Sequence, residues 1–472
     1  MKKQRPNLLF LFADQWRRQA MGFMKEDEVI TPNIDSFAEN SQVFDHALSC
    51  TPLCSPHRAA LLTGRYPIAT GVFTNCKIGS DAALKPEEIC ISDVLKQEGY
   101  QTGYIGKWHL DVPEQNYEKK PESGAAHWDA YTPPGPKRHG FDFWYSYGAF
   151  DQHLQPHYWK DTPQMVKVNE WSVKHETDVA IKYMKDHKEN GPFSLFVSWN
   201  PPHSPYDQVP DEYKKIYENK EITLRPNVTE GPFTAHTGEE LGGAKEELIE
   251  KTKDYFAAVT GIDHEFGRIL KFLEEEGLAD NTIVVLSADH GDLLGSHGML
   301  AKHVWYEESV GIPFLIRWPG KIHVGRDQKT LINSVDVMPT LLGLMGLPIP
   351  ATVQGTDLSA AMIGKEMEGP ETAFLACYPG RDVFLKAFEK AGFDPKTKGW
   401  RAVRTIDHTY VIHVGYWPEE TGVVRYLYDN KKDPYQMNPI EIQDPTENPI
   451  AKKLDKKLWE WIEKLEDPFR VM

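Results

Sequence analysis

Two short apolar runs in this sequence end in polar residues that can bind a cation. The run PNLLFLFA is followed by Asp14-Gln15, and the run TIVVLSA is followed by Asp289-His290. Such runs are typical of strands buried on both faces, and ligands of open α/β sheets bind at the carboxyl ends of strands. Two carboxylates and an amide oxygen form an oxygen-rich set, which predicts a site for a hard cation such as calcium.

A third segment of interest contains a cysteine that could be reactive. The segment CSPHR starts at Cys54, ends at Arg58 and is followed, after a short apolar run, by Thr63-Gly64. Alone, the pentapeptide also fits a buried cysteine near a helix start, with proline in the first turn. The longer string resembles the signature of the type I sulfatases of the alkaline phosphatase superfamily. This resemblance implies that a formylglycine-generating maturation enzyme reads the unfolded chain and oxidises Cys54 to formylglycine (3-oxoalanine), whose hydrated aldehyde attacks sulfur.

The segment GYIGKWHL supplies two basic residues, Lys107 and His109. Residues i and i+2 of a strand face the same side, so we expect both side chains to point into one pocket. The resemblance implies that Lys107 and Arg58 hold the formylglycine oxygen, and that His109 is the base for sulfate release.

The remaining basic residues of the sulfatase pattern are His203 and Lys302. His203 lies in the loop NPPHSPY, where prolines on either side restrict the backbone. The resemblance implies that Lys302 and calcium bind the sulfate oxygens, and that His203 with Lys302 protonates the leaving alcohol. The metal ligands that it implies are Asp14, Gln15, Cys54 as formylglycine, Asp289 and His290.

Gln15 departs from the commoner family pattern, in which a second aspartate stands here. An amide oxygen can still coordinate a cation, but it removes one negative charge from the site. Phosphonate and phosphodiester hydrolases of the same superfamily can carry glutamine here, so phosphonate monoester or phosphodiester hydrolysis is an alternative function. A catalytically silent protein that binds sulfated glycans, with Cys54 unmodified, is a third hypothesis.

The segment 111–160 mixes aromatic residues with aspartate, histidine and arginine. Aromatic rings stack on sugar faces while polar groups bind the hydroxyls, so this composition favours a carbohydrate substrate. We expect Asp151, His153 and His157 to contact that substrate. The segment resembles bacterial sulfatases acting on glycosaminoglycan sugars, which implies a small sulfated saccharide substrate with 6-O-sulfated N-acetylhexosamine as the first candidate.

The elements that must position these residues follow the pattern of an α/β protein. Alternating strand runs and helical stretches predict a large mixed, mostly parallel sheet flanked by helices, and the resemblance makes it alkaline-phosphatase-like. A small C-terminal antiparallel-sheet subdomain with a closing helix is also expected. We predict a catalytic domain over residues 1–365 and the small subdomain over 366–472. The principal elements expected are helices at 91–98, 246–276, 334–342 and 450–466, and strands at 400–405, 409–413 and 425–429.

Composition excludes some partners. The formal charge of −16 argues against nucleic acid, and it means that a local basic pocket must attract an anionic substrate. We expect Arg17 and Arg18 to contribute to that pocket together with the three site cations. No apolar run is long enough to span a bilayer, so no membrane partner is expected.

The cysteines and the N-terminal segment give two further expectations. The five cysteines form no Cys-x-x-Cys pattern, and we expect those other than Cys54 to be mostly free thiols. The N-terminal segment lacks a small-residue cleavage site, which predicts a cytoplasmic protein. A periplasmic or secreted protein whose leader has been trimmed is the alternative.

Overall fold

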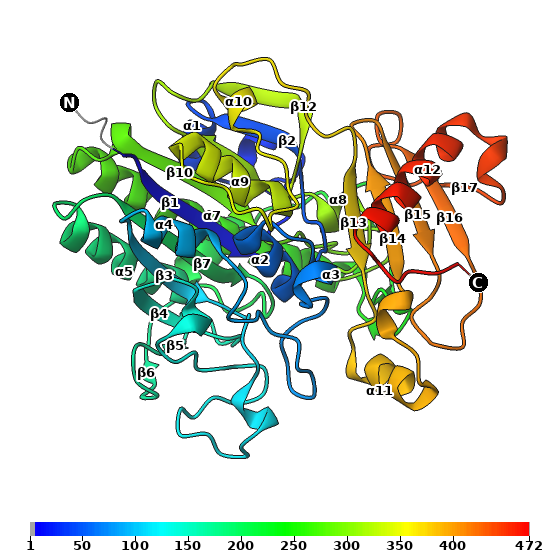
Figure 1. The fold of residues 1–472 in the computed structure, drawn as a ribbon, viewed down its shortest axis with the longest axis horizontal. Helices are drawn as coiled ribbons and strands as arrows, with labels where there is room; N and C mark the ends of the chain where they lie inside the picture. Colours follow the sequence, from blue (N-terminus) through cyan, green and yellow to red (C-terminus); the bar gives the residue numbers. More distant parts are fainter. Residues whose placement is uncertain (1–4, 472) are drawn as a thin grey trace.

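Two β-sheets lie side by side in the computed structural model, which describes residues 5–471 (Figure 1). The large sheet has eight strands in the order β12-β2-β11-β10-β1-β7-β3-β4. Its strands are β1 (Asn7–Asp14), β2 (Gln42–Leu48), β3 (Gln101–Lys107), β4 (Phe143–Tyr147), β7 (Phe193–Pro202), β10 (Thr282–Ala288), β11 (Phe314–Arg317) and β12 (Gly325–Asn333). The small sheet has the order β13-β14-β15-β16-β17, with strands β13 (Ala373–Cys377), β14 (Trp400–Arg404), β15 (His408–His413), β16 (Val424–Asp429) and β17 (Ile440–Glu441).

The centre of the large sheet is parallel. β1 pairs in parallel with both β10 and β7, and β3 pairs in parallel with β7 and β4. Only β11 runs antiparallel to its neighbours, β10 and β2, among the described strands of this sheet. All eight residues of β1 are buried, as expected for a strand covered on both faces. The predicted mixed, mostly parallel sheet is therefore confirmed.

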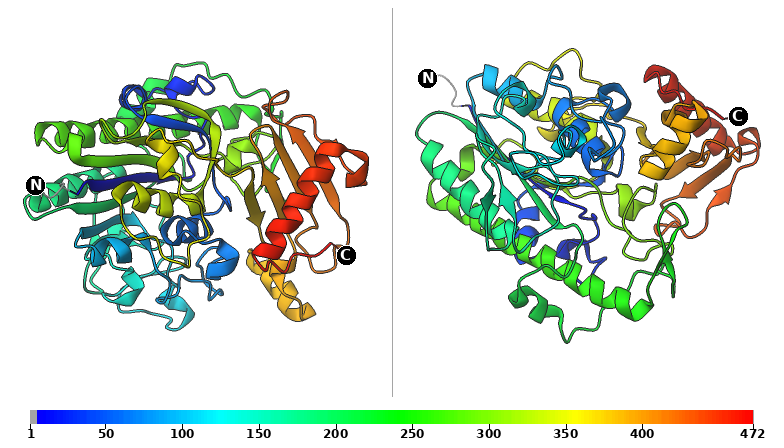
Figure 2. Two further views of the ribbon diagram at one scale, coloured as in Figure 1. Left: turned by 45° about the horizontal axis from the view of Figure 1, so that its top comes forward. Right: turned by 90° about the horizontal axis from the view of Figure 1, so that it is seen from below.

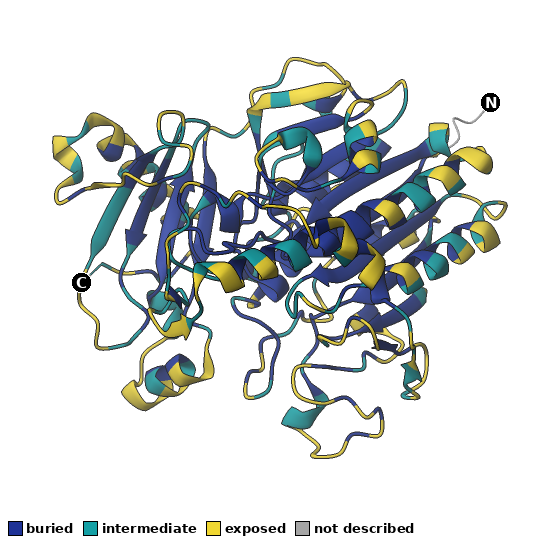
Figure 3. Cartoon of the chain, turned by 180° about the vertical axis from the view of Figure 1, so that it is seen from behind, coloured by how far each residue is buried: buried dark blue, intermediate teal, exposed yellow. Residues whose placement is uncertain are grey.

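Helices cover both faces of the large sheet. α5 (Ser172–His187) and α7 (Lys245–Glu275) lie together on one face, and α2 (Cys54–Thr63) and α9 (Ser334–Met345) lie on the other (Figure 2). Figure 3 shows the central strands of the large sheet buried along their length, whereas the edge strand β12 and the outer faces of the helices are exposed. The predicted long helix at 246–276 is confirmed by α7, whose buried residues recur at spacings of three and four.

The remaining elements are short. The helices are α1 (Pro32–Ala38), α3 (Pro67–Thr70), α4 (Ile91–Gln97), α6 (Asp211–Tyr217), α8 (Glu307–Val310), α10 (Ser359–Met362) and α11 (Asp382–Ala391). Two hairpins, β5 (His157–Tyr158) with β6 (Val166–Lys167) and β8 (Phe233–Thr234) with β9 (Glu240–Gly242), stand apart from the sheets. Within residues 5–471, the structure contains no helix with the length and apolarity needed to cross a membrane.

One helix, α12 (Pro449–Lys464), packs across the small antiparallel sheet (Figure 2). Its start follows from the sequence, because the Asn448 side chain accepts hydrogen bonds from the amides of Ile450 and Ala451, and proline occupies the first helical position. The chain beyond α12 returns to the sheet, where Asp467 forms an ion pair with Arg401 of β14 at 2.7 Å. Both side chains are 0% exposed.

Asp467→Ala is expected to lower the free energy of unfolding by about 3–5 kcal/mol, because the buried Arg401 guanidinium would lose its carboxylate. Denaturant unfolding followed by circular dichroism measures this. The control is Glu460→Ala, which removes an exposed ion pair with Lys456 and should cost less than about 1 kcal/mol. Equal effects of the two substitutions would contradict the prediction.

Candidate active site

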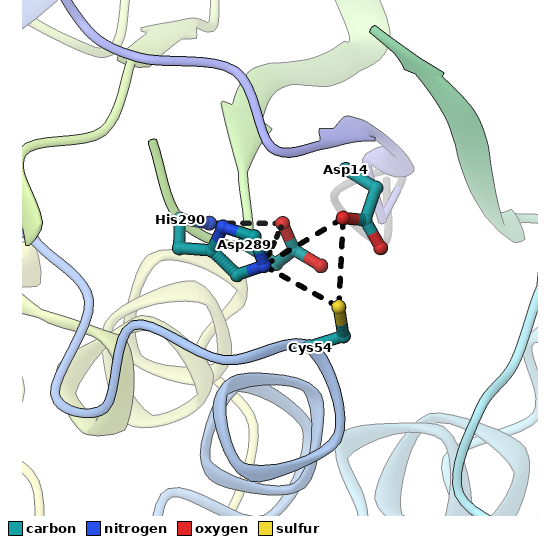
Figure 4. Close-up of side chains that lie close together, drawn as sticks. All are labelled: Asp14, Cys54, Asp289 and His290. Atoms are coloured by element: carbon teal, nitrogen blue, oxygen red, sulfur yellow. Dashed lines mark hydrogen bonds and ion pairs between the residues drawn. The ribbon is translucent and has the colours of Figure 1, made fainter. Parts of the chain in front are cut away.

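Four buried side chains meet where β1 and β10 end: Asp14, Cys54, Asp289 and His290 (Figure 4). Because Ala13 pairs with Ala288 in these parallel strands, the two aspartates that follow reach the same edge of the sheet. Cys54 begins α2, and its Sγ lies 3.5 Å from Asp14 Oδ1 and 3.3 Å from His290 Nε2. His290 Nε2 lies 3.6 Å from a carboxylate oxygen of each aspartate. The fold thus joins three segments that are far apart in the sequence.

The charges of this cluster suit a divalent cation. Burial and the neighbouring Asp14 carboxylate raise the pKa of Asp289 to about 7. Burial alone would also raise the pKa of Asp14, but Lys107, His203 and Arg58 lower it well below its usual value. The ligand atoms of all four side chains lie within 4.8 Å of one another. Two carboxylates that repel each other inside a dry site fit a hard cation, which would keep both ionised.

Gln15 adjoins this cluster and links it to Lys302. Its backbone amide donates to Asp289 Oδ1 at 3.0 Å, and its side-chain amide donates to Asp292 Oδ2 at 2.5 Å. The amide oxygen accepts a hydrogen bond from Lys302. Gln15 and Lys302, predicted as metal ligand and sulfate-binding residue, are therefore direct neighbours.

Two cations neutralise the carboxylates. Arg58, one helical turn after Cys54, donates to Asp14 Oδ2 and Asp289 Oδ2, each at 3.1 Å. Lys107 Nζ lies 2.7 Å from Asp14 Oδ2 and 3.1 Å from the side-chain oxygen of Asn200. Burial opposes the charge of Lys107, but Asp14 more than compensates and raises its pKa above the usual value. Both cations remain charged beside the cysteine.

His109 lines the site from outside strand β3, contrary to the prediction. β3 ends at Lys107, and His109 follows it with a φ of 53°, in the left-handed region, so the shared-strand prediction is wrong. Both residues nevertheless line the same cavity. His109 Nε2 donates to the Cys76 carbonyl at 3.0 Å, which leaves Nδ1 buried and without a partner among the described residues. Burial, Lys107 and Arg58 lower the pKa of His109 to about 3, so the ring is neutral and its Nδ1 can accept a proton.

His203 follows β7 and also lines the cavity. Its Nδ1 donates to the Ser204 carbonyl at 2.7 Å and lies 3.5 Å from Asp151 Oδ1. Burial and Lys302 lower the pKa of His203 to about 3. The ring is therefore neutral, even though the Asp151 carboxylate opposes this shift.

The three predicted substrate contacts lie in different environments. Asp151 lines the cavity with its side chain 49% exposed. His157 also lines it, but its Nε2 lies 2.6 Å from the buried Asp129 carboxylate. His153 is buried behind His203, and its ring nitrogen donates to the His203 carbonyl at 2.9 Å. The structure thus brings Asp151 and His157 to the cavity, whereas His153 supports the loop that carries His203.

The cavity above the cluster has a volume of about 1240 Å³. Its wall includes residues that no sequence motif indicated: Trp128, His236, His303 and Arg381. Arg17 and Arg18 do not contribute to it, because Arg17 pairs with buried Asp27 at 2.7 Å and Arg18 pairs with Glu307 at 3.2 Å. All five cysteines are buried free thiols, as predicted for those other than Cys54.

A mostly parallel α/β sheet with two aspartates and a histidine at the carboxyl ends of β1 and β10, and a cysteine at the start of α2 beside them, fits the alkaline-phosphatase-like hydrolase expected from the sequence. The chain belongs to the sulfatase family of the alkaline phosphatase superfamily, because the family model described as Sulfatase matches residues 6–347. A second model, N-sulphoglucosamine sulphohydrolase, C-terminal, matches residues 295–464. The protein is therefore a sulfuric ester hydrolase.

Individual relatives can be aligned with almost the whole of this chain. An endo-4-O-sulfatase of Bacteroides thetaiotaomicron is 35% identical over 99% of this chain and 93% of its own. An ulvan-active sulfatase of Formosa agariphila is 34% identical over 99% of this chain and 83% of its own. A solved structure from work on glycosaminoglycan metabolism by Bacteroides thetaiotaomicron has a TM-score of 0.86 at 34% identity, covering 98% of this chain and 97% of that one. Both named relatives are sulfatases, in agreement with the family assignment of this chain.

Proposed function

We propose that the protein hydrolyses a sulfate ester on a glycan oligosaccharide, using formylglycine formed from Cys54 and a calcium ion. The observation that carries this proposal is the position of Cys54, within 3.5 Å of Asp14 and 3.3 Å of His290 at the buried end of a large cavity. Cys54 Sγ stands where the hydrated formylglycine oxygens would be. Their role is to supply the nucleophile that attacks sulfur. The residues that would hold calcium are Asp14, Gln15, residue 54, Asp289 and His290.

The chain's own residues divide the remaining work. Arg58 and Lys107, beside residue 54 and fully charged, hold the nucleophilic oxygen in its reactive form. Lys302, which lines the cavity, binds a sulfate oxygen and offsets the charge that develops on it. A calcium ion held by the proposed ligands would supply further positive charge to the sulfate oxygens.

Two histidines move protons. His109 has a buried, unpartnered Nδ1, which suits the base that accepts a proton during sulfate release. His203 lies beside Lys302 in the cavity wall, where a bound sulfate would raise its low pKa and let it carry a proton to the leaving alcohol. A formylglycine-generating maturation enzyme is the partner that this proposal requires.

His203→Ala is expected to reduce kcat/KM about 10²-fold or more on a sugar sulfate, because a sugar alcohol leaves poorly without a proton. An aryl sulfate has a better leaving group, so its loss should stay below about tenfold. Steady-state kinetics on both substrates measures the difference. The control is His264→Ala, which removes a histidine 59% exposed on α7 and should change neither rate. Equal losses on both substrates would exclude the general-acid role.

The position of the sulfate is proposed from the relatives. The relative at 35% identity is named an endo-4-O-sulfatase, so we place a 4-O-sulfate ahead of the 6-O-sulfated N-acetylhexosamine expected from the sequence. A cavity of about 1240 Å³ also exceeds the roughly 300–1000 Å³ of typical small-molecule sites, which favours an oligosaccharide.

A desulfation screen tests the proposal. Saccharides of one to four units, sulfated at 2-O, 3-O, 4-O, 6-O or N, are compared with an aryl sulfate, a phosphonate monoester and a phosphodiester. We expect kcat/KM to be highest for a sulfated oligosaccharide. Activity on aryl sulfate with none on any saccharide would overturn the glycan assignment, and preference for the phosphodiester or phosphonate would favour the superfamily alternative. An unmodified Cys54 in a matured sample that binds glycans without turnover would favour the binding protein.

A further inference from the structure

Two histidines stack on each other in the cavity wall, outside the set of residues assigned to catalysis. His236 lies in the hairpin between β8 and β9, and His303 follows Lys302. Their ring centroids are 4.2 Å apart and their planes differ by 28°. Both residues line the cavity, and no described residue forms a hydrogen bond with a ring nitrogen of either. In this part of the structure, the nitrogens of the pair are therefore available to a ligand.

The histidine pair lies near Arg381, whose charge is shared with a carboxylate. Arg381, from the segment that leads into α11, forms an ion pair with Glu239 of the same hairpin at 2.6 Å and donates to Thr237 Oγ1 at 3.1 Å. Burial and Arg381 lower the pKa of His236 to about 3, and burial, His236 and Lys302 lower that of His303. The rings are neutral, so each offers one N–H donor and one acceptor nitrogen.

The cavity wall is much less acidic than the chain as a whole, whose formal charge is −16. It carries five cations, of which Lys77 pairs with Asp382, Lys107 with Asp14 and Arg381 with Glu239. Lys167 and Lys302 form no ion pair with a described residue, so they can attract an anion. In the proposed function the ester sulfate engages Lys302 while Lys107 holds the nucleophilic oxygen, which leaves the histidine pair beside Arg381 for a second anionic group.

We propose that the stacked pair of His236 and His303 is a subsite for an anionic group on the sugar next to the sulfated one. The two ring N–H groups donate to that group, and Arg381, which also pairs with Glu239, adds positive charge nearby. The shared chemistry is an anionic oxygen acceptor, either the carboxylate of a hexuronic acid or a second sulfate. The subsite rests on the proposed glycan function and extends it, because it makes the neighbouring sugar part of the specificity.

The substitution His236→Phe tests the subsite, because phenylalanine preserves the stack on His303 and removes both nitrogens. Four substrates are compared, all sulfated on the N-acetylhexosamine. The first is a disaccharide in which the neighbouring sugar is a hexuronic acid, and the second has a neutral hexose in its place. The third carries a second sulfate on that hexose, and the fourth is the sulfated monosaccharide alone. His264→Phe is the matched control, since His264 lies on α7 outside the cavity wall.

We expect His236→Phe to lower kcat/KM on the anionic disaccharides at least about tenfold, mainly through KM, as loss of a hydrogen bond to a charged group predicts. The losses on the neutral disaccharide and the monosaccharide should be at least about fivefold smaller. The comparison of carboxylate with sulfate identifies which anion binds. Equal losses on all substrates, or no loss on the anionic ones, would overturn the subsite, since a stack that only supports the hairpin is retained by phenylalanine.

A second variant and a binding measurement make the outcome independent of folding and turnover. His303→Asn changes the other ring, and asparagine tolerates the φ of 84° found at this position. Calorimetry with the unsulfated hexuronic acid disaccharide should show weaker binding to both variants than to the wild-type protein. If the wild-type protein desulfates no glycan, the proposed function is refuted but the subsite is not. If both variants bind the disaccharide as tightly as the wild-type protein does, the subsite is refuted.

Discussion

A Cys54→Ala variant is expected to lose at least about 10³-fold in kcat on every sulfate ester, while its fold and its substrate affinity persist. Alanine cannot be oxidised to formylglycine, and no serine or threonine side chain is among the four residues of the buried cluster to replace the nucleophile. Arg58, Lys107 and Lys302 remain in place, so binding of the anionic group should survive. Turnover of an aryl sulfate and calorimetry with an unreactive sulfated sugar separate the two effects.

The matched control is Cys377→Ala. Cys377 is a buried free thiol of β13 in the small sheet, and its loss should leave kcat within about twofold, because it touches no cavity residue assigned to catalysis. Mass spectrometry of the Cys54 peptide completes the test by separating the aldehyde from the thiol. Full activity in a sample whose Cys54 is entirely thiol would contradict the formylglycine mechanism.

Asp289→Asn is expected to remove the bound metal ion and to lower kcat/KM by at least about 10²-fold. The substitution keeps the size of the side chain but removes one of the two carboxylates that face each other in the cluster. Metal content by plasma mass spectrometry and activity during calcium titration measure the two losses. High calcium concentrations should restore part of the activity if the weakened site still binds.

The control for this prediction is another buried carboxylate. Asp336 lies in the first turn of α9, where burial raises its pKa to about 6, and Asp336→Asn should retain the metal ion. Stoichiometric calcium in Asp289→Asn would exclude Asp289 as a ligand. Loss of metal in both variants would point to general destabilisation.

The fold and the centre of the site could be predicted from the sequence because they depend on local patterns. The apolar runs before Asp14 and Asp289 specify buried strands, and parallel pairing brings their ends together whatever the intervening chain does. Cys54 is predictable for the same reason, since its motif is read along the chain. These residues can be identified without knowing which side chains they contact in the folded protein.

The rest of the site depends on contacts that adjacent residues do not reveal. Arg17 and Arg18 lie within three positions of Gln15, yet Asp27 and Glu307 pair with them and keep them out of the cavity. His153 resembles a substrate contact in sequence, but its ring lies beneath His203. His236 and His303 are 67 positions apart and are brought into contact only by the packing of two loops. No periodicity indicates such a pairing.

The burial of Cys54 has a consequence for how active protein accumulates. Its side chain is 1% exposed and is enclosed by the ends of two strands, so a folded chain gives a second protein no access to the thiol. Under the proposed formylglycine mechanism, oxidation and folding would therefore compete for the same newly synthesised chain, and a molecule that folds first would keep its cysteine. The specific activity of a preparation would then reflect the ratio of two rates during synthesis, and adding maturation enzyme to purified protein should not increase it.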